Sequence, residues 1–251
     1  MSTAPVLRTK IASTISALPS RVGLIIPSVN RMTEPQFNHY APRGFEINVT
    51  RARVAGKWNR PLAELVDEIG MAAKLLSDAA PDLIVFHCTD TAMREGSTGE
   101  RTILEIVKKT SGIEADATSR MVLDAIRTLG LRKLLVLSPY RSNRTVIDYL
   151  EEAGINVIHD VALGLDTDAS TRFTPSEWAD LAREHDRDGI DGIFLSCANT
   201  TQIDAIEAIE QSLGKPVVNS NQAVLWGCLK RLQSNLQPTA RMPSLGRLFA
   251  T

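Results

Sequence analysis

Two four-residue segments of the chain combine a cysteine with groups that can assist it. The segments are 88–91 (CTDT) and 197–200 (CANT), and both follow short apolar runs. A thiolate is a nucleophile and a base, and N–H groups at a helix start lower the pKa of a thiol and bind carboxylates. Two thiols on opposite sides of a small acid allow one to remove a proton while the other donates one. They equally allow one thiolate to add to an electron-poor double bond while the other thiol supplies a proton. Neither route needs a cofactor.

The repetition of this pattern separates two of the three cysteines from the third. A lone cysteine after an apolar strand is more often a small buried hydrophobic residue than a nucleophile. Cys88 and Cys197 share the repeated pattern, whereas Cys228 lies in a helical pattern and its counterpart in the first half is Ala125. We therefore predict that Cys228 only packs. His87 precedes Cys88 and should point the opposite way along a strand, which favours a buried, structural role.

Metal and phosphate sites are disfavoured by the spacing of the residues that would form them. The three cysteines and four histidines are scattered, without CxxC or HxxxH spacing, and an odd number of cysteines does not suggest a disulfide framework. The chain also lacks GxGxxG and GxxxxGK[ST]. We expect no metal and no cofactor.

The composition is that of an ordinary globular protein, with 43% hydrophobic and 23% charged residues. The 28 Lys and Arg nearly balance the 29 Asp and Glu, so the net charge of −1 predicts no nucleic-acid or anionic membrane partner. No apolar run approaches the ~20 residues that span a bilayer. The start of the chain lacks the apolar core of a signal peptide. We expect a cytoplasmic protein, and apolar helix faces favour a homo-oligomer.

Strands and helices alternate along the sequence, which predicts an α/β fold with parallel sheets. Short apolar runs typical of buried parallel strands occur at 22–26, 83–86, 133–137 and 192–195, with a further strand expected at 45–54. Apolar residues at helical spacing occur at 61–76, 144–153, 176–187 and 201–213.

Three segments recur in the same order, offset by about 100 to 111 residues, which indicates a duplicated domain rather than a solenoid. The pairs are 21–28 with 132–140, 82–91 with 192–201, and 112–129 with 214–232. We predict two similar, pseudo-symmetric halves, each a parallel sheet flanked by helices. The expected boundaries are an N-terminal arm 1–20, halves 21–130 and 131–233, and a C-terminal tail 234–251. Ligands bind at the carboxyl ends of parallel strands, so the two cysteines should meet across a cleft between the halves.

Four motifs give the chain a resemblance to a known family: 26–30 (IPSVN), 88–91 (CTDT), 138–140 (SPY) and 196–199 (SCAN). On these motifs the chain resembles the aspartate/glutamate racemase superfamily, particularly its maleate cis-trans isomerase and arylmalonate decarboxylase branch. The resemblance covers about residues 20–233. It implies a cofactor-independent isomerase acting on a small carboxylate, with maleate to fumarate as the best named reaction.

The resemblance also implies roles for individual residues. Cys88 would add to the double bond, and Cys197 would deliver and recover a proton. Asn30 and Tyr140 would contact substrate carboxylates, although Asn30 also fits a helix cap and Tyr140 a packing role. The other predicted substrate-binding residues are Ser28, Thr89, Asp90, Asn143, Ala198 and Asn199. The two residues after each cysteine would bind the substrate through their backbone N–H groups. Asn143, like Asn30, also fits a helix cap.

Departures from the family pattern keep other reactions open. Arylmalonate decarboxylases carry glycine at the first cysteine, so the presence of Cys88 favours an isomerase or racemase. Asp166 and Asp168 stand where maleate isomerases have an amide, and a solvated loop is their simplest interpretation. The alternatives are an amino-acid or hydantoin racemase, an arylmalonate-type decarboxylase, and a non-catalytic carboxylate-binding protein. The segment 43–60 is expected to include a loop that closes over the cleft.

Overall fold

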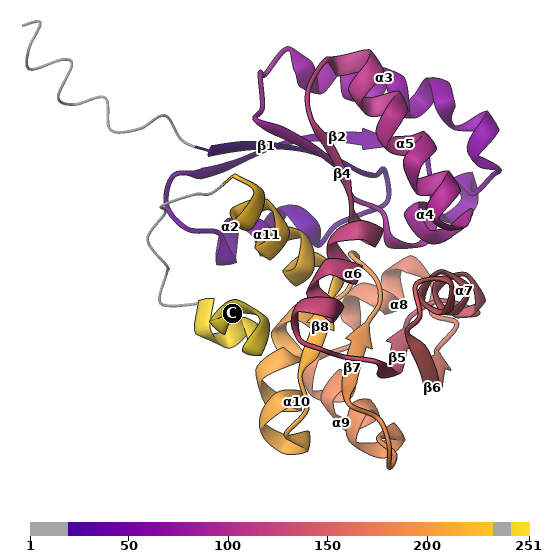
Figure 1. Ribbon diagram of the computed structural model, residues 1–251, viewed down its shortest axis with the longest axis vertical. Coiled ribbons are helices and arrows are strands. Elements are labelled where there is room, and N and C mark those ends of the chain that lie inside the picture. The colour runs from indigo at the N-terminus through magenta and orange to yellow at the C-terminus, as the bar shows by residue number, and fades with distance from the viewer. Residues whose placement is uncertain (1–19, 233–241) are drawn as a thin grey trace, which may run out of the picture.

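The computed structural model describes residues 20–232 and 242–251, which form two four-stranded sheets. All paired strands are parallel, and the strand orders β2-β1-β3-β4 and β6-β5-β7-β8 repeat one topology (Figure 1). The predicted α/β fold with two similar halves is confirmed. The strands are β1 (Ser20–Pro27), β2 (Phe45–Ala52), β3 (Leu83–Phe86), β4 (Ala115–Ala117), β5 (Lys133–Ser138), β6 (Asn156–Ala162), β7 (Gly192–Leu195) and β8 (Val217–Asn219).

Helices flank both sheets. They are α2 (Thr33–Tyr40), α3 (Val66–Ser77), α4 (Thr89–Met93), α5 (Gly96–Ser111), α6 (Thr118–Thr128), α7 (Arg144–Glu152), α8 (Thr167–Arg172), α9 (Pro175–His185), α10 (Ile206–Leu213) and α11 (Ser220–Arg231). The helix predicted at 61–76 begins as the 3-10 turn Leu62–Glu64 before α3, and the one at 201–213 begins as the 3-10 turn Gln202–Ala205. The first of these turns is held by the Glu95 carboxylate, which accepts a hydrogen bond from the Leu62 N–H at 2.7 Å.

The two strands that precede the cysteines are buried along their whole length. Every residue of β3 and of β7 is buried, so both faces of each strand are covered. This is why both read as continuous apolar runs rather than as an alternating pattern. The carboxyl ends of the two strands are therefore rigidly placed.

One helix from each half packs with the other half. The α6 residues Val122 and Ile126 belong to the same buried cluster as Leu134 and Phe194 of the second sheet. Val224 of α11 clusters with residues of the first sheet and α2, and α6 contacts α11 directly. Figure 1 shows α11 beside β1 and α2, and α6 descending beside the second sheet. The halves thus share a core, which fixes the position of one active-site edge relative to the other.

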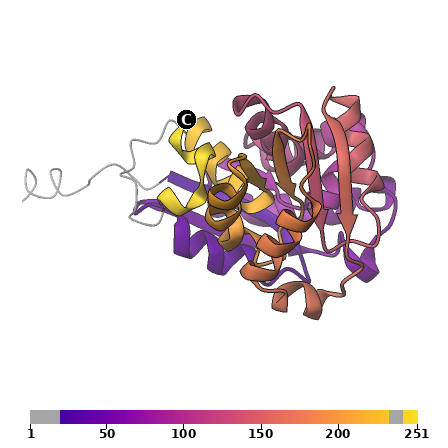
Figure 2. The same cartoon turned by 90° about the horizontal axis from the view of Figure 1, so that it is seen from below.

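The predicted arm, 1–20, lies outside the described residues except for Ser20, which is the first residue of β1. Of the predicted C-terminal tail, 234–251, the structure describes residues 242–251. Two 3-10 turns there bury Leu245 and Leu248. The carbonyl of Leu245 accepts a hydrogen bond from Gln222 Nε2 at 2.7 Å. Figure 2 shows this segment against the second half of the molecule.

Two surface observations bear on partners. Within the two described ranges, no helix is long and apolar enough to cross a membrane. Met71 and Leu75 lie one turn apart on α3 and are 59% and 56% exposed. The homo-oligomer stays a prediction.

Candidate active site

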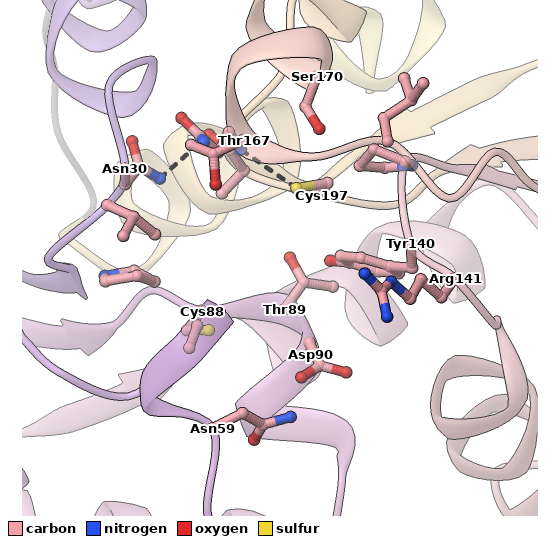
Figure 3. Close-up of a pocket in the computed structure, with 18 of the residues that line it drawn as sticks. Asn30, Asn59, Cys88, Thr89, Asp90, Tyr140, Arg141, Thr167, Ser170 and Cys197 are labelled. Atoms are coloured by element: carbon pink, nitrogen blue, oxygen red, sulfur yellow. Dashed lines mark hydrogen bonds between the residues drawn. The ribbon is translucent and has the colours of Figure 1, made fainter.

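The two cysteines follow equivalent strands and line the same cavity. Cys88 follows β3 and Cys197 follows β7, each two residues beyond the last strand residue. The cavity has a volume of about 380 Å³ and receives residues from both halves (Figure 3). Its lining consists of Pro27, Val29, Asn30, Ala55, Gly56, Asn59, Cys88, Thr89, Asp90, Pro139, Tyr140, Arg141, Ser142, Leu165, Thr167, Ser170, Cys197, Ala198 and Asn199. Eight of the ten predicted site residues are among them.

The two other predicted residues, Ser28 and Asn143, are not part of the lining. The Ser28 N–H donates to the Ala52 carbonyl at 2.7 Å, which continues the pairing of β1 with β2. Asn143 is buried behind the cavity, where Oδ1 accepts from Ser138 Oγ at 2.5 Å and Nδ2 donates to Asp160 at 3.0 Å. Its side chain makes no cap bond to α7. Ser138 Oγ accepts from the Tyr140 N–H at 3.1 Å, so Asn143 supports the turn that carries Tyr140.

Asn30 lines the cavity with every polar atom of its side chain engaged. Its Oδ1 accepts from the N–H groups of Met32 and Thr33, both at 3.0 Å, which fixes the turn that precedes α2. Its Nδ2 donates to Thr33 Oγ1 at 3.0 Å and to the Ala198 carbonyl at 3.2 Å. Asn30 therefore joins the first half to the turn that carries Cys197.

The Cys88 thiol is buried and lies at the start of α4. Its Sγ donates to Thr91 Oγ1 at 3.1 Å, and that hydroxyl in turn donates to the Val54 carbonyl at 2.8 Å. Burial raises the pKa of Cys88 to about 11. The expectation of a lowered pKa is wrong for this residue, because the loss of hydration on burial outweighs the hydrogen bonds with Thr91.

The Cys197 thiol is half-buried and is held differently. The Asn199 N–H donates to its Sγ at 3.4 Å, and the nearby Tyr140 hydroxyl favours the thiolate form, which lowers the pKa of Cys197. Burial nevertheless raises the pKa of Cys197 to about 11, so the expected lowering is wrong here too. Burial and the neighbouring Cys197 raise the pKa of Tyr140 well above its usual value, so this phenol stays neutral and can donate. Cys197 also has a φ of 154°, a strained conformation of the kind found at functional sites.

Two buried residues that the sequence did not single out connect the cysteine turns. Ser220 Oγ accepts from Thr89 Oγ1 at 2.9 Å and from the Cys197 N–H at 3.2 Å. Asn221 Nδ2 donates to the Ala198 carbonyl at 3.1 Å, and Asn221 Oδ1 lies 2.7 Å from His87 Nε2. Both belong to the repeat of 112–129 in 214–232, at the start of α11, and that repeat was the available signal.

His87 is fully buried, as expected, and its other ring nitrogen lies 2.7 Å from Thr118 Oγ1. Burial lowers the pKa of His87 to about 4, so the ring is neutral near pH 7. His87 thus supports the turn carrying Cys88 and does not enter the cavity.

The two acids of the second half, Asp166 and Asp168, do not line the cavity. Asp166 caps α8 by accepting from the Ala169 N–H at 2.8 Å. Asp168 pairs with Arg31 of the first half at 2.5 Å, with both side chains more than half exposed. The cavity is lined instead by Thr167 and Ser170 of α8. From the segment 43–60, the residues in the lining are Ala55, Gly56 and Asn59.

In the described part of the chain, no group of three His, Cys, Asp or Glu side chains could hold a metal ion. The chemical groups of the cavity include two thiols, a neutral phenol, and the N–H groups at the start of α4, which lack partners inside the helix. This arrangement defines a cysteine-based site between two halves of an α/β protein.

The chain belongs to the family described as arylmalonate decarboxylase (Amdase), which it matches over residues 22–249. It lies in the maleate isomerase and arylmalonate decarboxylase branch of the Asp/Glu racemase-like superfamily, as its motifs indicated. It is 25% identical over 247 residues to the maleate isomerase of Geobacillus stearothermophilus, covering 92% of this chain and 97% of the relative.

Two solved structures show the same fold. The maleate isomerase Iso of Pseudomonas putida S16 has a TM-score of 0.81 and 25% identity, with 91% of this chain and 97% of that chain covered. A maleate cis-trans isomerase mutant of Nocardia farcinica, with a covalently bound succinylcysteine intermediate, has a TM-score of 0.80 and 22% identity, with the same coverage.

Proposed function

We propose that this protein is an isomerase that converts maleate to fumarate by two-cysteine chemistry. The observation that carries the proposal is the placement of Cys88 and Cys197 on one cavity, from equivalent strand ends of the two halves. The maleate isomerases among its relatives, and the succinylcysteine in the Nocardia farcinica enzyme, support this choice of substrate.

The reaction proceeds by addition and elimination. The Cys88 thiolate adds to one olefinic carbon, and the π electrons form a carbanion, delocalised into the adjacent carboxylate, on the other carbon. Cys197 gives its proton to that carbon, which leaves a succinyl thioether with a freely rotating C–C bond. After rotation, the Cys197 thiolate removes the proton, the double bond re-forms in the trans geometry, and the Cys88 thiolate leaves. Atoms and charge balance, because Cys197 regains the proton that it gave.

The groups around the thiols suit this sequence. The N–H groups of Thr89 and Asp90 open α4 and can bind a carboxylate while negative charge develops on it. The neutral Tyr140 hydroxyl can donate to the Cys197 thiolate when the proton has moved to the substrate. Burial raises the pKa of both thiols to about 11, so both are protonated near neutral pH and the Cys88 proton passes to solvent before the thiolate adds.

A decarboxylase is the second candidate, because the family that the chain matches is described as arylmalonate decarboxylase. In that reaction a malonate-type acid loses carbon dioxide, the enediolate is stabilised by the same N–H groups, and Cys197 protonates the product carbon. Cys88 has no step in this route. Its presence in the cavity therefore favours the isomerase.

The proposal is tested by NMR in deuterated water, with maleate and phenylmalonate as separate substrates. The wild type should convert maleate to fumarate, and Cys88→Ser and Cys197→Ser should each lower that rate by roughly a thousandfold or more. Cys228→Ser is the matched control, because Cys228 is buried outside the cavity, and it should retain the activity. Absence of fumarate from the wild type, or an unchanged rate in Cys88→Ser, overturns the proposal. Deuterated phenylacetate as the sole product supports the decarboxylase.

A further inference from the structure

The cavity holds one acidic and one basic side chain, Asp90 and Arg141. Among the described residues that line it, no other Asp, Glu, Lys or Arg is present. Asp90 is neutralised by Arg94, whose guanidinium lies 2.6 Å from the carboxylate. The cavity therefore offers a ligand one uncompensated positive charge.

Arg141 lies in the loop between β5 and α7, directly after Tyr140. Its side chain is exposed and makes no hydrogen bond or ion pair within the described ranges, 20–232 and 242–251. Neighbouring arginines differ: Arg31 pairs with Asp168, and Arg144 pairs with Asp148. Figure 3 shows the Arg141 guanidinium pointing towards the cavity, on the side of Thr89 and Asp90.

We propose that Arg141 determines specificity for dicarboxylates by binding the second carboxylate of the substrate. The inference rests on the proposed function for the reaction, and it goes further by assigning the two carboxylates to different partners. One carboxylate takes the N–H groups of the cysteine turns, and the other takes the planar fork of the guanidinium, which matches a carboxylate in two hydrogen bonds.

Charge compensation explains why such a residue is needed. The Cys88 thiol is buried and the Cys197 thiol is half-buried, and a dianion that reaches them without a counter-charge would lose hydration at high cost. Arg94 is occupied by Asp90, which leaves Arg141 to compensate the second charge. A monocarboxylic acid with an apolar substituent does not need this contact. Arg141 therefore favours substrates such as maleate over monoacids.

The test compares maleate with its monomethyl ester, which keeps the electron-poor double bond and one carboxylate. Arg141→Gln should lower kcat/KM for maleate by roughly 10- to 100-fold, mainly through KM, as expected for lost hydrogen bonds to a charged group. The kcat/KM for the ester should fall much less, so that the ratio of kcat/KM for maleate to that for the ester decreases. Arg141→Lys should recover part of the preference, because it restores the charge without the fork. Arg144→Gln removes an equivalent charge outside the cavity and should leave kcat/KM unchanged for both maleate and the ester.

Binding of succinate, a saturated dicarboxylate, gives a readout that does not depend on turnover. Calorimetry should show weaker succinate binding to Arg141→Gln than to the wild type, and unchanged binding to Arg144→Gln. Equal losses for maleate and ester, or unchanged kinetics and succinate binding, overturn the role of Arg141 while leaving the isomerase proposal intact. A wild type that turns over neither substrate overturns the isomerase proposal, and succinate binding then decides on Arg141 alone.

Discussion

The buried His87 should make the folded protein sensitive to acid, through a single side chain. Burial lowers the pKa of His87 from 6.5 to about 4, so the folded protein keeps the ring neutral while the unfolded chain takes up a proton. The contribution of His87 to the free energy of unfolding is therefore fully present above pH 6.5. It is lost as the pH falls through that value to about 4.

The loss amounts to about 3 kcal/mol over this range, because each pH unit between the two pKa values is worth about 1.4 kcal/mol. Protonation would also place a charge between Thr118 and Asn221, which are both buried. Acid should thus first weaken the contact between the turn carrying Cys88 and the helix α11.

Urea unfolding at pH 7, 6, 5 and 4 measures the effect. His87→Gln should be less stable than the wild type at pH 7, but its free energy of unfolding should fall less between pH 6.5 and pH 4. His39→Gln is the matched control, because His39 is exposed on α2, and it should keep the wild-type dependence. A His87→Gln variant that loses stability as steeply as the wild type would refute the reasoning.

Three further predictions follow from the contacts around the site. The kcat/KM for maleate should rise about tenfold per pH unit from pH 7 to pH 9, because burial raises the pKa of Cys88 to about 11 and the thiolate reacts; a flat profile contradicts this. Asn221→Leu should lower the free energy of unfolding in urea by about 2–4 kcal/mol, because buried partners including the Ala198 carbonyl lose a hydrogen bond. A loss below about 1 kcal/mol would contradict a stabilising role for these hydrogen bonds. Arg31→Gln should cost less than about 1 kcal/mol in thermal unfolding, because its ion pair with Asp168 is exposed, and a larger cost would mean that this pair holds the two halves together.

The sequence predicted features that depend on local pattern or on repetition. The apolar runs at 83–86 and 192–195 are buried strands, because a strand covered on both faces needs apolar residues at every position. The repeated cysteine motif placed both thiols at equivalent strand ends. Cys228 packs in the core, as its helical setting indicated.

Features that depend on contacts between the halves were not predictable. The exchange of α6 and α11 requires knowing which apolar face meets which sheet, and the sequence does not give this for either helix. The positions of Ser220 and Asn221 depend on that exchange, because α11 brings both residues between the two cysteine turns. The direction of the thiol pKa shift was predicted wrongly for a similar reason. Proximity to a helix start is visible in a sequence, whereas the degree of burial, which raises the pKa, is not.

The two thiols follow equivalent strands of the two halves, but the groups that contact them differ. Thr91 and Thr200 occupy equivalent positions, yet Thr91 contacts the thiol of Cys88 whereas Thr200 Oγ1 contacts the Cys197 carbonyl and Gln202. Cys197 Sγ instead accepts a hydrogen bond from the Asn199 N–H, and Tyr140 lowers its pKa. A racemase that runs in both directions uses each thiol as acid and as base, so similar surroundings suit it. Addition followed by proton return gives one thiol a nucleophilic role and the other an acid–base role, and the unequal surroundings of the two cysteines therefore favour isomerisation over racemisation.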